Sequence, residues 1–187
     1  MKNILILAVP RSGSSNLLHS IAAAYNFEQV FEPKPWHLHK NKWKIKDNQV
    51  AKVISFPYKI KFPNFYKEII NSYDKTILLS RYGVKEQIES LAVLKHNTID
   101  SRNVNRKWSE DELKEVSSNE MRDVENLVMN NRKTIEEISK EFNLPINYYE
   151  DVYSQKSLIE KDIKLDLTFF EKTKKCRTPS LESKYLL

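Results

Sequence analysis

Serine, glycine and arginine are concentrated in one short stretch near the N-terminus, where their spacing suits the binding of an anion. PRSGSSN occupies residues 10–16, directly after an apolar run at residues 4–9 and at the start of a helical pattern. A turn between a strand and a helix directs backbone N–H groups and the positive end of the helix dipole at a bound phosphate. The small residues 12–15 allow close approach, and Arg11 adds a fixed positive charge. The stretch therefore predicts a phosphate site, and the alternative is an ordinary turn with serine caps.

A nucleotide-kinase P-loop, with the pattern G-x-x-x-x-G-K-[ST], fits this stretch poorly. When the pattern is aligned on Gly13, its first glycine falls on Ala8 and its lysine falls on Ser14. The stretch therefore lacks the lysine that reaches the β- and γ-phosphates of a nucleoside triphosphate. A P-loop kinase-like enzyme stays an alternative, together with a nucleotide-binding module that has no catalytic activity.

The stretch resembles the 5′-phosphosulfate loop of the sulfotransferases that use 3′-phosphoadenosine 5′-phosphosulfate (PAPS) as donor. Three further segments follow in the order found in that family. A Glu-Pro segment of bacterial members is similar to VFEPKPW at residues 30–36. The 3′-phosphate motif of the family is similar to ILLSRYGVKEQIES at residues 77–90, and its Tyr-Glu-Asp strand is similar to INYYEDV at residues 146–152. The resemblance covers residues 4–152. It implies sulfuryl transfer from PAPS to a hydroxyl or amine of a small-molecule or glycan acceptor, which the sequence does not identify.

The resemblance also implies the residues that bind the donor. The loop would hold the 5′-phosphosulfate, and Arg81 and Ser90 would hold the 3′-phosphate. A basic C-terminal segment would close over the 3′-phosphate; the alternative is that this segment is a solvated tail. Ser90 follows Arg81 by nine residues, where eight is usual, so the two share a ligand only if the turn at Gly83 absorbs the extra residue. The donor-binding residues implied in this way are Arg11, Ser12, Gly13, Ser14, Ser15, Asn16, Arg81, Ser90, Lys175 and Arg177.

Sulfuryl transfer needs positive charge at the departing phosphate and a base for the proton of the acceptor. Arg11 would neutralise the charge that develops between phosphorus and sulfur. For the base we favour Glu32, because the Glu-Pro segment returns to the carboxyl edge of the sheet near the loop. His37 and His39 are the rivals, since their ordinary pKa suits proton transfer. Lys52, at the end of the second predicted strand, is a candidate for supporting catalysis or an ordinary residue at a strand end.

No metal site is predicted. His37 and His39 are two residues apart, but no third ligand follows at a suitable spacing. Glu150 and Asp151 are interpreted as structural residues that orient the nucleotide loop. His19 and His96 are interpreted as packing or surface residues of helices.

The elements that must position these residues alternate between strands and helices. Buried strands are predicted at residues 4–9, 50–55 and 75–80, and a fourth short strand and its exit at residues 146–152. Helices are predicted at residues 14–25, 64–72, 84–95, 121–142 and 158–165. Ser109 and Glu112 predict a capping box that opens a charged helix ahead of the long one. This alternation predicts an α/β fold, a three-layer sandwich with a parallel doubly wound sheet that binds ligands at the carboxyl ends of its strands. The resemblance specifies the P-loop-like sulfotransferase form of this fold.

The composition predicts a single domain over residues 1–187, because 40% of the residues are apolar and can fill one core. A net charge of +6 suits an anionic ligand, but the 25 acidic residues among 31 basic ones disfavour nucleic acid. One cysteine excludes an internal disulfide and indicates a reducing, cytoplasmic compartment. The first apolar run is too short for a signal peptide, and no membrane span is expected. We expect an acceptor pocket that is open or completed by a second subunit in a homodimer.

Overall fold

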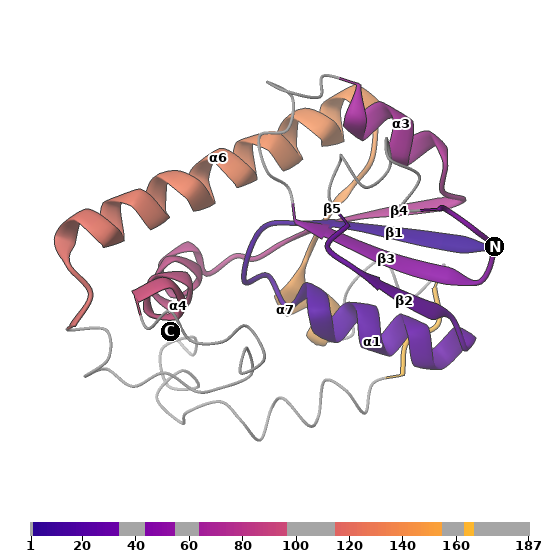
Figure 1. Cartoon of the computed structure of the whole chain (residues 1–187), viewed down its shortest axis with the longest axis horizontal. Coiled ribbons are helices and arrows are strands. Elements are labelled where there is room, and N and C mark those ends of the chain that lie inside the picture. Colours follow the sequence, from indigo (N-terminus) through magenta and orange to yellow (C-terminus); the bar gives the residue numbers. More distant parts are fainter. Residues whose placement is uncertain (1, 34–43, 55–63, 97–114, 155–162, 167–187) are drawn as a thin grey trace.

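A computed structural model of the chain describes residues 2–33, 44–54, 64–96, 115–154 and 163–166, which form a parallel sheet with helices on both faces (Figure 1). The strands are β1 (Asn3–Ala8), β2 (Glu28–Phe31), β3 (Gln49–Ile54), β4 (Lys75–Ser80) and β5 (Ile146–Tyr148). Their order in space is β2-β3-β1-β4-β5, and every neighbouring pair is parallel. The predicted α/β class and parallel sheet are therefore confirmed.

Helices pack on the two faces through side chains that alternate along the strands. α1 (Ser14–Tyr25) and α7 (Tyr149–Tyr153) cover one face, and α3 (Phe65–Asn71), α4 (Val84–His96) and α6 (Ser118–Phe142) cover the other (Figure 1). In β1, Ile4 and Ile6 belong to the core under α1, whereas Leu5 and Leu7 belong to the core under α4 and α6. This central strand is buried on both faces, as its continuous apolar run predicts.

The sequence predicted the buried elements well and the exposed ones poorly. β1, β3 and β4 lie within one residue of their predicted bounds, and α1 has the predicted bounds. The prediction of four strands is wrong, because β2 is a fifth strand at the edge of the sheet, and its mostly exposed residues give no continuous apolar run. The helix predicted at residues 158–165 is wrong at its described end, since residues 163–165 are not helical. Ser109 and Glu112 lie outside the described residues.

A capping box fixes the start of α6. The Ser117 hydroxyl accepts a hydrogen bond from the backbone N–H of Glu120 at 3.3 Å, and the Glu120 carboxylate accepts from the backbone N–H of Ser117 at 2.9 Å. His96, at the end of α4, lies 3.1 Å from the same carboxylate. These contacts lower the pKa of Glu120 to about 2, and the hydrogen bond from the Ser117 hydroxyl has the largest effect. The box thus joins the beginning of α6 to the end of α4.

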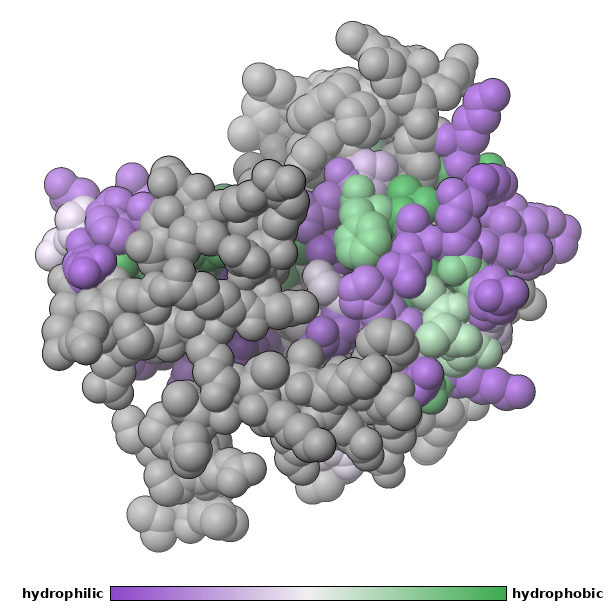
Figure 2. Space-filling model, turned by 60° about the horizontal axis from the view of Figure 1, so that its bottom comes forward, coloured by the Kyte–Doolittle hydropathy of each residue, from purple (hydrophilic) through white to green (hydrophobic). Residues whose placement is uncertain are grey.

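Viewed from the side of α1, the described surface has hydrophilic residues around several apolar ones (Figure 2). Phe31 of the edge strand β2 is one large apolar residue that is exposed. Among the described helices, none combines the length and the apolar content needed to cross a bilayer.

The order of the strands creates a switch point at the carboxyl ends of β1 and β4. These neighbouring strands are followed by helices on opposite faces, α1 after β1 and α4 after β4. In doubly wound sheets, ligands bind in the crevice that opens between two such connections. The turn at residues 9–13 follows β1, and residues 81–83 follow β4. The two segments that the sequence singled out for phosphate therefore lie side by side.

Candidate functional site

The turn between β1 and α1 contains two residues with left-handed backbone conformations, Arg11 with φ 60° and Gly13 with φ 77°. A Cβ atom added at Gly13 would lie 2.3 Å from two ring carbons of Tyr149. Glycine is therefore required at this position both by its backbone conformation and by the ring that packs on it. Tyr149 thus occupies the space that a side chain at this position would need.

The serines of the turn line the N-terminus of α1. This helix begins at Ser14 without a side-chain cap, so its first N–H groups are not satisfied by a capping side chain. Ser12 is fully buried, and its hydroxyl has no hydrogen-bond partner in the part of the chain that the structure describes. A buried polar group without a partner destabilises the fold, and a bound anion would remove that cost. The turn thus has the groups that an anion-binding site needs.

Arg11 and its neighbour Pro10 connect the turn to α4. Nε of Arg11 donates a hydrogen bond to the hydroxyl of Ser90 at 2.9 Å, and Nε2 of Gln87 donates to the carbonyl of Pro10 at 2.5 Å. Burial lowers the pKa of Arg11, and repulsion by the nearby guanidinium of Arg81 lowers it further. Two positive charges therefore lie close together at the switch point, an arrangement that an anion would stabilise.

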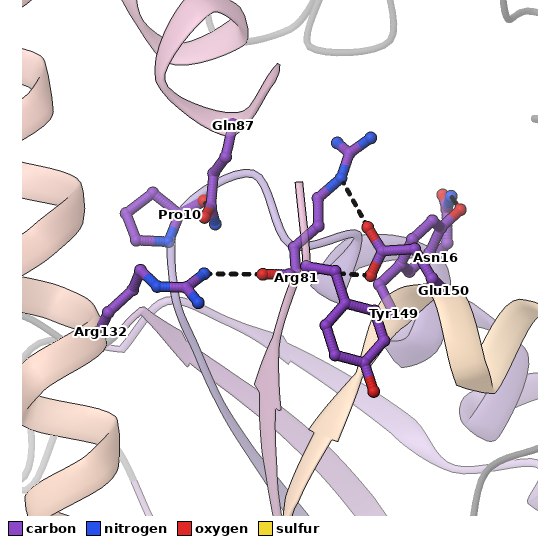
Figure 3. Close-up of polar contacts among 8 residues, drawn as sticks. Pro10, Asn16, Arg81, Gln87, Arg132, Tyr149 and Glu150 are labelled. Carbon is purple, nitrogen blue, oxygen red and sulfur yellow. Dashed lines mark hydrogen bonds and ion pairs between the residues drawn. The ribbon is translucent and has the colours of Figure 1, made fainter. Parts of the chain in front are cut away.

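Arg81 is held in place at the end of β4 by groups from two other segments (Figure 3). Its Nε donates to Oε1 of Glu150 at 3.1 Å, and its carbonyl accepts a hydrogen bond from Arg132 of α6 at 2.7 Å. The second oxygen of Glu150 accepts the backbone N–H of Tyr82 at 3.0 Å. Within the described residues, the terminal nitrogens of Arg81 have no hydrogen-bond partner. The guanidinium is thus fixed through Nε and keeps its terminal donors for a ligand.

Tyr149 and Glu150, consecutive residues of α7, contact both halves of this site. The buried ring of Tyr149 packs against Gly13, and its hydroxyl accepts a 3.5 Å hydrogen bond from Asn16. Glu150 holds Arg81, as described above. The interpretation of Glu150 as a structural residue agrees with this arrangement, although the residue that orients the loop is Tyr149.

A second cluster lies at the carboxyl ends of β2 and β3. Nζ of the buried Lys52 is 2.9 Å from Oε1 of Glu32 and 3.0 Å from the hydroxyl of Ser15. Glu32 has φ 43°, and its side chain is 44% exposed. The ring of Phe31 lies 5.6 Å from the Lys52 ammonium and 5.6 Å from the ring of His19. Lys52 therefore connects a half-exposed carboxylate to the first turn of α1.

The structure gathers the described candidate residues into these two adjacent clusters. Arg11, Arg81 and Ser90 lie at the switch point. Glu32 and Lys52 lie on the other side of the turn, where Lys52 contacts Ser15 of α1. The hydroxyl of Ser90 pairs with Arg11. His37, His39, Lys175 and Arg177 lie outside the described residues. Among the residues described, no group of three or more His, Cys, Asp or Glu side chains is placed to hold a metal ion.

Three residues of the site were missed by the sequence analysis. Gln87 is fully buried and stands at helical spacing between Val84 and Leu91. A polar residue on the apolar stripe of a helix is the pattern that could have identified it as a site residue. Arg132 likewise follows the buried Val128 by one helical turn. Tyr149 stands inside the INYYEDV segment, but nothing in the sequence indicates that its ring contacts Gly13.

Comparisons with known proteins do not assign this site to a family. No protein-family model matches the sequence, and no curated protein matches it at a significant level.

Proposed function

We propose that the chain is a sulfotransferase with a P-loop-like form of the parallel α/β fold, which transfers a sulfuryl group from PAPS to a hydroxyl or amine of a small-molecule or glycan acceptor. One observation carries the proposal. Arg11 and Arg81, 70 positions apart in the sequence, follow the neighbouring parallel strands β1 and β4 and bring two positive charges to the switch point, beside the N-terminus of α1. PAPS carries anionic groups at the 3′ and 5′ positions of one ribose, so a single ligand would engage both arginines.

The described residues fit such a ligand. The backbone N–H groups of residues 12–15 and the hydroxyl of Ser12 would hold the 5′-phosphosulfate at the start of α1. The terminal nitrogens of Arg81 would hold the 3′-phosphate while Nε stays on Glu150. Ser90 would keep Arg11 between the two anionic groups through the hydrogen bond to Nε. A contribution from Lys175 and Arg177 stays a prediction.

The second cluster supplies the groups that act on the acceptor. Bound PAPS would provide the sulfuryl group and leave as adenosine 3′,5′-bisphosphate. Glu32 would take up the proton that the acceptor hydroxyl or amine loses, and Arg11 would stabilise the negative charge that develops on the departing phosphate. Because Lys52 contacts both Glu32 and Ser15, it would hold the base at a fixed position relative to the loop.

A P-loop kinase-like enzyme is the second candidate, and one observation favours it. The loop lacks the kinase lysine, but Lys52 brings an ammonium group to Ser15 in the first turn of α1 from the neighbouring strand. Such an enzyme would bind ATP in a Mg²⁺-dependent manner.

Isothermal titration of the wild-type protein with adenosine 3′,5′-bisphosphate, AMP and ATP with Mg²⁺ tests the proposal. We expect adenosine 3′,5′-bisphosphate to bind at least about tenfold more tightly than AMP, because a hydrogen bond to a charged group contributes about 1.5–3 kcal/mol. Equal affinities for these two ligands would contradict the proposal. Tighter, Mg²⁺-dependent binding of ATP would favour the kinase-like enzyme.

A further inference from the structure

Tyr82 is more than half exposed, and yet its position is fixed by three contacts. Its ring stacks on the ring of Tyr148, with centroids 4.0 Å apart and planes 10° from parallel. Its hydroxyl donates to Asp151 at 2.7 Å, and its backbone N–H donates to Glu150 at 3.0 Å. Fixing an exposed side chain costs conformational entropy. A flat aromatic surface is therefore kept in one orientation at the surface of the protein.

This surface lies beside the anion-binding arginine. Tyr82 directly follows Arg81, and Tyr148 is the last residue of β5, so the stacked pair stands at the carboxyl ends of β4 and β5. One oxygen of Glu150 accepts from the guanidinium of Arg81 (Figure 3). The other accepts the backbone N–H of Tyr82. The same carboxylate thus fixes a cation for a phosphate and an aromatic face for a planar ring.

The phenol of Tyr82 stays neutral over the physiological pH range. Its hydrogen bond to Asp151 is the first of several causes that raise the pKa of Tyr82 to about 12. An uncharged ring next to Arg81 does not repel an anionic nucleotide.

We propose that the outward face of Tyr82 stacks on the base of the nucleotide whose phosphates Arg11 and Arg81 hold, an inference that rests on the proposed function. A base with phosphates on its ribose presents a planar ring and anions on one small molecule, which matches an aromatic face next to a guanidinium. Stacking contributes affinity but discriminates little between bases. The 3′-phosphate, rather than the identity of the base, would therefore select the donor.

Two probes that differ only in the base test this inference by isothermal titration. They are adenosine 3′,5′-bisphosphate and methyl ribofuranoside 3,5-bisphosphate, which has the same two phosphates and no base. We expect Tyr82→Ala to weaken binding of the adenosine compound by about 5- to 150-fold, the usual effect of losing one base–aromatic stack, and to leave binding of the ribofuranoside unchanged. Tyr82→Phe is the matched control, because it keeps the ring, and should bind both probes like the wild type.

Several outcomes would overturn the inference. One is equal binding of the two probes by the wild type, and another is an equal loss for both probes, or no loss, in Tyr82→Ala. In these cases preference for adenosine 3′,5′-bisphosphate over AMP would leave the proposed function standing. Without that preference both proposals would fail.

Should Tyr82→Ala not fold, NMR of the wild type decides the question. Intermolecular NOEs between adenine H2 or H8 and the Tyr82 ring are expected in the complex. Their absence from the saturated complex would overturn the inference.

Discussion

Arg81 and Glu32 stand at the carboxyl edge of the sheet on opposite sides of β1, and their surroundings differ. Around Arg81, each described contact joins segments far apart in the sequence, such as its own hydrogen bond to Glu150, 69 residues away. Around Glu32, a single buried ammonium holds a carboxylate that is 44% exposed. Residues of α6 and α7 form hydrogen bonds with Arg81, whereas Glu32 lies at the edge of the sheet.

This difference indicates which part of the proposed reaction needs a preformed site. A donor with two anionic groups must be bound at both of these groups, which requires two arginines near each other. The fold supplies the free energy of bringing the two arginines together before the ligand binds. An acceptor must instead approach the base, so a half-exposed carboxylate suits it. We therefore interpret the region around Arg81 as the donor side and the region around Glu32 as the acceptor side.

The largest effect is expected on the acceptor side. Glu32→Gln should lower kcat about 10²- to 10⁴-fold, the usual contribution of a general base, and leave the affinity for adenosine 3′,5′-bisphosphate unchanged. Transfer of ³⁵S from labelled PAPS to an acceptor found by screening measures kcat. Glu28→Gln, at an exposed residue of β2 paired with Lys46, is the matched control. An unchanged kcat would show that Glu32 is not the base and that another residue, such as His37, has this role.

On the donor side, Gly13→Ala should destabilise the protein by about 2–5 kcal/mol. The new methyl group would meet the ring of Tyr149, and alanine is strained at φ 77°. Denaturant unfolding measures the change. The second glycine, Gly83, does not have a positive φ, so Gly83→Ala is the control and should have a small effect.

A double variant separates the two causes. Gly13→Ala combined with Tyr149→Ala removes the clash and keeps the backbone strain, so its loss of stability should be smaller than the sum of the two single losses. Additive losses would show that Tyr149 does not restrict this position.

Arg81→Met should weaken binding of adenosine 3′,5′-bisphosphate about 10- to 150-fold and binding of AMP less than threefold. It removes the group proposed to hold the 3′-phosphate, which AMP lacks. Lys85→Met removes one positive charge from an exposed position of α4 and serves as the control in the same titrations. Equal losses for the two nucleotides would assign Arg81 to general attraction of anions instead.

The smallest effect is expected far from both regions, at the start of α6. Ser117→Ala should cost about 1 kcal/mol at neutral pH through loss of the N-cap and should not change nucleotide binding. The folded pKa of Glu120, about 2, lies below its ordinary value of 4.5. The stabilisation from its ionised form is therefore complete above about pH 4.5 and is lost as the pH falls through 2. Unfolding at pH 6 and at pH 2 should show a smaller cost at the lower pH, and an equal cost would contradict this assignment.

The sequence predicted the elements that bury continuous apolar runs and the loop between two of them. The bounds of α1 and β4 and the positions of Arg11 and Arg81 at strand ends follow from local patterns. The contacts that join these residues into a site do not follow from local patterns, because such contacts depend on packing between distant segments. The ring of Tyr149 on Gly13 and the hydrogen bond of Gln87 to Pro10 are examples.

The central claim is that one ligand engages the loop and Arg81 together. A crystal structure of the wild-type protein with adenosine 3′,5′-bisphosphate tests it most directly. We predict one phosphate on the backbone N–H groups of residues 12–15 and the other on the terminal nitrogens of Arg81. A ligand bound elsewhere, or a ligand that engages the loop while Arg81 contacts neither phosphate, would contradict the account.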